Sequence, residues 1–307
     1  MKTTKWLSAA AGLCAGLLTA SSALAHEPGT PNVMPSGATM GVPVGANFPV
    51  EGLYFSSRTA LVRGNSFDAE GNQGPVGLDI NVTAAQIHWT PGWELLGGTY
   101  RAMAILAYQD LDLTLNGTSI GDNTSLSDLT ISPLNVHWML QPGVFASAGI
   151  SFSLPVGDFS TAQGAVNGGR GAPAVGVDFG YSYLRDGWNL SAHVNYFHHF
   201  ENPETNYQSG DQILLNWTAM RAIGESGWSA GLVGYERRQI TDDRNNGTFY
   251  RGATAERARE SGIGLAVARR FGPIEVYADY TRSIAGRNTI AADQLRLNVT
   301  FPLGGGS

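Results

Sequence analysis

Apolar and polar residues alternate with a period of two in about twelve stretches of the chain. The clearest stretch is residues 291–301, where Leu295, Leu297, Val299 and Phe301 share one parity and polar residues occupy most of the other. Successive side chains of a strand point to opposite faces, so this pattern predicts a strand with one apolar and one polar face. Most of the stretches reach the roughly 9 to 11 residues that a tilted transmembrane strand requires.

The predicted strands cover residues 53–63, 77–89, 99–113, 125–140, 144–155, 174–184, 188–200, 211–221, 228–240, 259–271, 274–282 and 291–303. Short turn signals, such as those at 141–143 and 185–187, alternate with longer segments rich in Gly, Asn, Asp and Ser. Outer-membrane barrels have short periplasmic turns and long external loops. The sequence therefore predicts an all-β fold, a transmembrane antiparallel up-and-down β-barrel of about 12 strands within residues 51–307.

Residues 1–25 have the pattern of a cleaved export signal. Two lysines precede an apolar run over residues 6–18, and Ala-Leu-Ala at 23–25 forms a cleavage site. We therefore expect the mature chain to begin at His26 and to reach the outer membrane of a Gram-negative bacterium. The only cysteine is Cys14, so we expect no disulfide and no thiolate metal site in the mature chain.

Arginine is the only cation of the expected mature chain, because both lysines lie in the export signal. The 17 remaining basic residues face 25 Asp and Glu, which gives a formal net charge of −8. This balance argues against a nucleic-acid partner. The partners we expect are outer-membrane lipid, periplasmic chaperones, the barrel-assembly machinery and a small hydrophobic solute. The sequence implies no cofactor.

Polar residues that share the inward parity are candidates for the lining of the lumen. They are Arg58, Asp79, Asp110, Asp112, Asp128, Asp178, His193, Asn195, His199, Asn216, Glu260, Glu275, Asp279, Arg296 and Asn298. Such an interior is either a satisfied, partly filled core or a polar path that guides a small solute. A bulge near Pro133 would shift the parity of its strand.

Residues 26–50 are rich in proline and glycine, and Glu27 is their only acidic residue. Such a segment cannot fold alone. It is either a flexible periplasmic leader or a plug in the lumen that uses Met34, Met40 and Phe48 as apolar contacts. A plugged, narrow lumen would favour poorly water-soluble solutes over ions.

Patterns that indicate catalysis or metal binding are few. His198 and His199 point to opposite faces of one strand, so they cannot both bind one metal ion unless the strand breaks. His137, His193 and His199 are not accompanied by Ser and Asn in a recognisable catalytic run. We therefore expect no enzyme activity and no metal site.

Seven short segments, in order along the chain, carry a resemblance. They are GLYF at 52–55, TPGWELLGGTY at 90–100, SDLTISPL at 127–134, LPVGDF at 154–159, GWNLS at 187–191, ENPET at 201–205 followed by SGD at 209–211, and QITDD at 239–243. Together they resemble the outer-membrane family named for the meta-pathway of phenol degradation. The resemblance implies a barrel that passes hydrophobic or aromatic compounds across the outer membrane, and it transfers no binding residue to this chain.

Three functions follow as hypotheses from these patterns. A channel or transporter for small hydrophobic or aromatic compounds agrees with the even strand number and the polar interior parity. A structural or adhesive barrel without transport would use its loops to bind other surfaces. An outer-membrane hydrolase would need a catalytic site near the rim. Ionic conductance and uptake of hydrophobic solutes discriminate among them.

Overall fold

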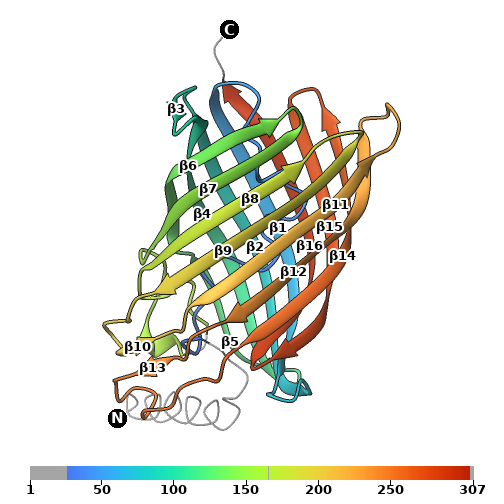
Figure 1. The fold of residues 1–307 in the computed structure, drawn as a ribbon. Coiled ribbons are helices and arrows are strands. Elements are labelled where there is room, and N and C mark those ends of the chain that lie inside the picture. Colours follow the sequence, from blue (N-terminus) through green and yellow to red (C-terminus); the bar gives the residue numbers. More distant parts are fainter. Residues whose placement is uncertain (1–25, 165, 305–307) are drawn as a thin grey trace.

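The computed structural model describes residues 26–164 and 166–304, and within them twelve long antiparallel strands close into a barrel (Figure 1). The predicted export signal at residues 1–25 lies outside the described residues. The barrel strands are β1 (Gly52–Phe67), β2 (Gln73–Thr90), β4 (Gly98–Leu115), β6 (Leu129–Gln141), β7 (Val144–Leu154), β8 (Ala174–Tyr183), β9 (Trp188–His199), β11 (Gln212–Ala222), β12 (Trp228–Gln239), β14 (Arg259–Phe271), β15 (Ile274–Arg287) and β16 (Thr289–Gly304).

Each barrel strand pairs with its neighbours in the sequence, and β1 pairs with β16 to close the sheet. Closure leaves no unpaired strand edge, which a sheet in a bilayer requires because lipid offers no hydrogen bonds. The predicted all-β barrel of twelve antiparallel strands is thereby confirmed. The remaining elements are short: β3 (Glu94–Leu95), β5 (Thr118–Leu126), the 3-10 helix η2 (Thr161–Gln163), β10 (Tyr207–Gln208) and β13 (Arg244–Asn245).

The predicted strand at 125–140 is two strands in the structure. Its first residues belong to β5, which pairs with β4 in a hairpin, and β6 begins at Leu129. Asp128 lies at the break, where its carboxylate accepts hydrogen bonds from the backbone N–H groups of Gly157 and Arg170, both at 3.1 Å. The register of β6 with β7 then shifts between Ile131 and Leu134, because Pro133 has no N–H to donate to the ladder.

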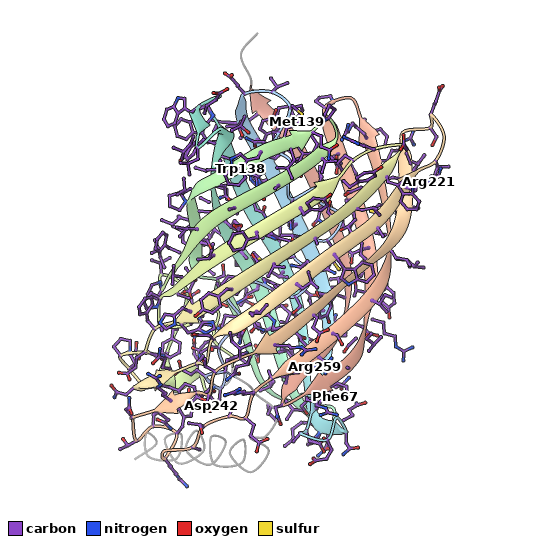
Figure 2. All side chains as sticks on the ribbon, viewed as in Figure 1. Phe67, Trp138, Met139, Arg221, Asp242 and Arg259 are labelled. Atoms are coloured by element: carbon purple, nitrogen blue, oxygen red, sulfur yellow. The ribbon has the colours of Figure 1, made fainter. Side chains whose placement is uncertain are left out.

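Short turns gather at one end of the barrel and long loops at the other. The carboxyl terminus and β3 lie at the short-turn end, and the β10–β13 pair lies at the long-loop end (Figure 1). Trp138 and Arg221 are at the first end, and Asp242 and Arg259 are at the second (Figure 2). Because barrels of this kind have short turns in the periplasm, the long-loop end is the external one.

Apolar side chains cover the outer face of the barrel at mid-height. The exposed fractions there are 69% for Leu265, 50% for Leu297 and 47% for Leu232. No helix in the described part of the chain is long and apolar enough to cross a membrane. At the short-turn end the outward residues become aromatic or cationic, and the Arg221 guanidinium lies 5.2 Å from the centre of the Trp188 ring. Aromatic rings at this level are typical of the periplasmic girdle.

The outward-facing apolar residues of β16 test how deeply each position of the strand lies in the bilayer. We expect Leu297→Arg, at mid-height of the row, to destabilise the inserted barrel by roughly 2 to 4 kcal/mol, since a charge there must leave water. Leu303→Arg is the matched control, because Leu303 is 52% exposed on the same strand near its periplasmic end. The free energy of unfolding is measured for both variants in lipid vesicles. Equal losses of stability would contradict this placement of the barrel in the membrane.

Candidate functional site in the barrel lumen

Residues 26–50 run through the interior of the barrel from its external end to its periplasmic end (Figure 1). Tight turns follow one another along the segment, for example Ala38 N–H to Pro35 O at 3.1 Å and Ala46 N–H to Pro43 O at 2.9 Å. These turns satisfy part of the backbone locally, which suits a chain rich in proline and glycine. Side chains of the barrel wall provide many of the remaining partners.

Glycine is required where the segment passes closest to the wall. Gly37 and Gly41 both have a φ of +79°, a conformation that side chains disfavour. A Cβ atom at Gly37 would lie 2.2 Å from Nη1 of Arg296, and one at Gly41 would lie 1.9 Å from Cε2 of Tyr277. The glycines therefore allow the backbone to lie directly against charged and aromatic side chains of β15 and β16.

The external end of the segment is held by Glu27, whose side chain is buried. Its carboxylate accepts hydrogen bonds from Asn202 Nδ2 at 3.0 Å, Thr205 Oγ1 at 2.5 Å and Tyr250 Oη at 3.3 Å. Burial raises the pKa of this carboxyl, while the bonds from Thr205 and Asn202 oppose the rise. These partners belong to two external loops, so the segment joins loops that are distant in the sequence.

Arg170 attaches a third external loop to the segment. Its Nη1 donates to the carbonyl oxygen of Pro31 at 3.0 Å, and the backbone N–H of Asn167 donates to Gly29 O at 3.0 Å. Burial lowers the pKa of the Arg170 guanidinium, and the carboxylates of Asp128 and Glu27 oppose that shift. The β7–β8 loop thus folds toward the external part of the lumen.

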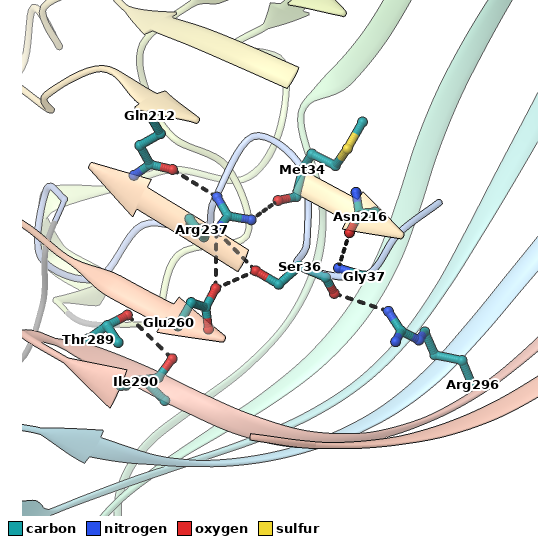
Figure 3. Close-up of polar contacts among 10 residues, drawn as sticks. All are labelled: Met34, Ser36, Gly37, Gln212, Asn216, Arg237, Glu260, Thr289, Ile290 and Arg296. Carbon is teal, nitrogen blue, oxygen red and sulfur yellow. Dashed lines mark hydrogen bonds and ion pairs between the residues drawn. The ribbon is translucent and has the colours of Figure 1, made fainter. Parts of the chain in front are cut away.

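A buried ion-pair network holds the middle of the segment (Figure 3). Arg237 is 2% exposed, and its Nε donates to Ser36 Oγ at 3.0 Å and to Glu260 Oε1 at 3.1 Å. Its Nη1 donates to Gln212 at 2.8 Å, and its Nη2 donates to the carbonyl oxygen of Met34. All three guanidinium nitrogens are therefore occupied, and two of them hold the segment.

A second buried ion pair lies beside the first. Arg296 Nη2 is 2.8 Å from Asp279 Oδ1. Arg296 Nη1 donates to the carbonyl oxygen of Ser36 at 3.0 Å, as Figure 3 shows. On the opposite wall, Asn216 Oδ1 accepts a hydrogen bond from Gly37 N–H at 2.8 Å. Residues 36 and 37 are consequently held from β11, β12, β14 and β16 together.

The periplasmic half of the segment is held mainly by hydroxyl groups. Thr218 Oγ1 accepts from Gly41 N–H at 2.8 Å, and Ser182 Oγ accepts from Gly45 N–H at 2.9 Å. Thr39 Oγ1 is 3.0 Å from His193 Nδ1, while the other nitrogen of this ring lies 3.3 Å from Asp178. Hydrogen bonds between a hydroxyl group and the backbone are weaker anchors than the contacts to arginine in the middle part.

The three predicted apolar contacts of the segment lie at different depths. Met40 is 1% exposed and packs in a core cluster with residues of β9, β11, β12, β14 and β15. Met34 is partly buried against the same cluster. Phe48 stacks on Tyr54 near the periplasmic end, with ring centres 3.9 Å apart. The segment therefore adds apolar packing to its polar contacts.

Most of the predicted lumen residues point into the barrel. Nine of them are buried: Asp128, His193, Asn195, His199, Asn216, Glu260, Asp279, Arg296 and Asn298. Arg58 and Asp178 are intermediate, and both lie on inward parity. Glu275 lies on inward parity at the periplasmic rim, where it pairs with Arg270 at 3.1 Å. The segment brings Asp178, His193, Asn216, Glu260, Asp279 and Arg296 together around it, whereas Glu275 lies apart.

Three predicted lumen residues, Asp79, Asp110 and Asp112, lie on the outer face instead. Asp79 forms an exposed pair with Arg63 at 3.4 Å, and Asp112 pairs in register with Asp79. At this height β2 and β4 extend beyond the bilayer. The apolar side chains of Val76 and Leu113 point inward there and pack against Val166 of the β7–β8 loop. Polar residues face water on the outside, so the parity that holds in the membrane is reversed.

Several functional contacts were not predicted from the sequence. Arg237 stands between Glu236 and Arg238, and a run of three charged residues contains no alternation. Counting alternate residues forward from the outward-facing Trp228 places Glu236 and Arg238 outside and Arg237 inside. Asn202, Thr205 and Tyr250 lie in loops, where strand parity carries no information.

Some buried polar groups have no hydrogen-bond partner within the described residues. They include Nε of Arg58, Nε of Arg101, Nδ1 of His88 and Nε2 of His137. These four residues belong to β1, β2, β4 and β6, and further groups without a partner, such as Tyr235 Oη and Tyr277 Oη, lie on β12 and β15. Buried polar groups of this kind usually bind water. We call the four side chains on β1, β2, β4 and β6 the polar lane.

The described residues contain no group of three or more His, Cys, Asp or Glu side chains that could hold a metal ion. The geometry instead places a segment in the lumen that the wall holds along its length. Residues 62–299 match the family model described as "Putative MetA-pathway of phenol degradation". The chain belongs to this family. The resemblance inferred from the seven short segments is thus confirmed.

A solved structure agrees with the fold. The crystal structure of an outer membrane channel from Pseudomonas putida F1 has a TM-score of 0.74 and 15% sequence identity, and the match covers 88% of this chain and 99% of that chain. The translocator domain of the autotransporter NalP from Neisseria meningitidis has a TM-score of 0.48 and 14% identity, covering 97% of each chain. No curated protein matches the sequence. The chain is thus an outer-membrane β-barrel in fold.

Proposed function

We propose that the protein is an outer-membrane channel for small hydrophobic or aromatic compounds, and that residues 26–50 plug its lumen. The observation that carries the proposal is the set of contacts that hold the segment against inward-facing residues along the whole barrel. Family membership supports it, as does a fold like that of the channel from Pseudomonas putida F1. The plug excludes ions, and a neutral solute passes by replacing contacts of the segment.

The strand number explains why such a barrel uses a plug. Barrels of about 8 strands are filled by their own side chains, whereas barrels of about 16 to 18 strands enclose a water channel. A barrel of twelve strands lies between these cases, so an additional segment is needed to close its lumen. Because the segment has few apolar anchors and many polar ones, a solute can replace individual contacts without unfolding the barrel.

The polar lane supports passage of aromatic compounds that carry a hydroxyl group. Nε2 of His137 is an unpaired acceptor, because Nδ1 of this ring donates to Gly45 O at 3.2 Å, and Nδ1 of His88 is a further unpaired ring nitrogen. Nε of Arg58 and Nε of Arg101 are donors that the described residues leave unpaired. A phenolic oxygen can accept from such donors, while the apolar ring packs against Phe48, which lies 5.7 Å from the Arg101 guanidinium. Chemistry of this kind favours neutral, weakly polar rings over ions.

Uptake measurements test the channel directly. Cells that express the full chain should accumulate labelled phenol and toluene faster than cells carrying an empty vector, because the barrel offers a path across the outer membrane. Glucose serves as the control solute, since the plugged lumen gives it no advantage. The absence of any difference across several aromatic compounds, with the barrel present in the outer membrane, would contradict transport and favour a structural barrel.

A further inference from the structure

Three arginines lie side by side on the outer face of the barrel near its external end. Arg238 of β12 pairs in register with Arg259 of β14, and Arg259 pairs with Arg287 of β15. The side chains of Arg238 and Arg259 keep 56% and 49% of their exposure, and Arg287 is also exposed. Adjacent strands are about 4.8 Å apart, so this arginine row is about 10 Å wide.

Like charges at directly opposed positions of a sheet destabilise it. One carboxylate, that of Glu236, contacts the row, at 2.6 Å from Nε of Arg238 and 3.1 Å from Nε of Arg259. Arg287 forms no ion pair with any residue that the structure describes. The row therefore keeps a surplus of positive charge that an external anion would stabilise.

The height of the row on the barrel matches the external surface of the bilayer. Arg238 follows Trp228 by ten residues along β12, and Trp228 lies in the periplasmic girdle beneath Arg269 at 4.9 Å. Ten residues of a strand tilted by about 40° rise about 26 Å, close to the apolar band of about 25 Å. Figure 2 accordingly shows Arg259 at the end of the barrel opposite Arg221.

An apolar groove adjoins the row. Ile213, Leu215 and Ile240 line a shallow pocket together with Glu236 and Arg238. Ile213 and Ile240 are each 37% exposed on the face that meets lipid. Ile213 is opposite Arg238 in register, and Leu215 is opposite Glu236. Cations with branched aliphatic side chains beside them form a surface that complements an anionic lipid, which has a charged headgroup and an acyl chain.

We propose that the face formed by β11, β12, β14 and β15 binds lipid A, the phosphorylated glycolipid of the outer leaflet. The arginine row binds its phosphates, and the groove of Ile213, Leu215 and Ile240 receives an acyl chain. Guanidinium groups bind phosphate oxygens in pairs, which favours arginine in such a site. A row about 10 Å wide extends over three strands, so it suits a headgroup with two phosphates better than a phospholipid with one.

Native mass spectrometry of the refolded mature chain in detergent tests this site with bisphosphorylated lipid A. The variant R238Q/R259Q/R287Q removes the row, so we expect affinity for lipid A to fall by at least about tenfold. The matched control is R221Q/R269Q, which removes two arginines from the periplasmic end of β11 and β14. The control should bind lipid A as the unmodified chain does.

Other outcomes would overturn the proposal. Equal binding by the row variant and the unmodified chain would show that the arginine row does not bind lipid A. Equal losses in both variants would indicate attraction by overall charge, and undiminished binding of phosphate-free lipid A would show that the acyl chains suffice. Binding of phosphatidylglycerol as tight as that of lipid A would exclude a site built for two phosphates. The site is independent of solute transport, because none of its residues faces the lumen.

Discussion

Deleting residues 31–47 should convert a nearly silent barrel into one with a steady ionic conductance. The deletion removes the contacts to Arg237, Arg296, Asn216, Thr218 and Ser182, while the strands keep all their inter-strand hydrogen bonds. The emptied lumen of a twelve-stranded barrel is wider than its own side chains can fill. Planar-bilayer recordings of refolded protein measure the change.

A single substitution tests the same idea with a matched control. Gly41 and Gly117 both have a φ of +79°, so Gly41→Ala and Gly117→Ala introduce the same backbone strain. A Cβ at Gly41 would meet the Tyr277 ring, whereas no atom lies within 4 Å of one at Gly117. Only Gly41→Ala should displace the segment and raise conductance. Unchanged conductance in both the deletion and Gly41→Ala, with folded barrels, would contradict the plug.

The strands could be predicted from the sequence because bilayer and lumen impose opposite polarity on the two faces of each strand. The prediction fails where that contrast ends. At the external ends of β2 and β4, Leu78 and Leu113 are inward and Asp79 and Asp112 are outward, as in a water-soluble sheet. In one strand the apolar side chains therefore face outward in the membrane and inward above it. Alternation alone cannot show at which residue the apolar face changes.

The interior site was less accessible to sequence reasoning than the fold. Candidate wall residues such as Glu260 and Arg296 followed from parity, and Met40 followed from the composition of a nearly uncharged segment. Their pairing did not follow, because Ser36 contacts Glu260 across 224 residues of sequence. Contacts of an irregular segment depend on where each turn places it, and periodicity contains no such information.

The ion pair of Arg237 and Glu260 should be the most sensitive point of the segment's attachment. Arg237→Ala leaves the Glu260 carboxylate buried without its cation, and breaking such a pair costs about 3 to 5 kcal/mol. The same change frees Met34 O and Ser36 Oγ from their donor. We therefore expect a lower midpoint of denaturant unfolding together with bursts of conductance, because the middle of the segment loses its strongest anchor.

Arg270→Ala is the control, since Arg270 pairs with Glu275 at the rim while 71% exposed. Exposed pairs contribute about 0 to 1 kcal/mol, so this variant should keep its stability and remain silent. Replacing both members, as in Arg237→Met with Glu260→Met, removes the unpaired charge and should restore much of the stability lost in Arg237→Ala. Conductance should stay raised in the double variant, because methionine cannot donate to Met34 O. If instead the double variant were as silent as the unmodified protein, the ion pair would stabilise the wall without holding the segment.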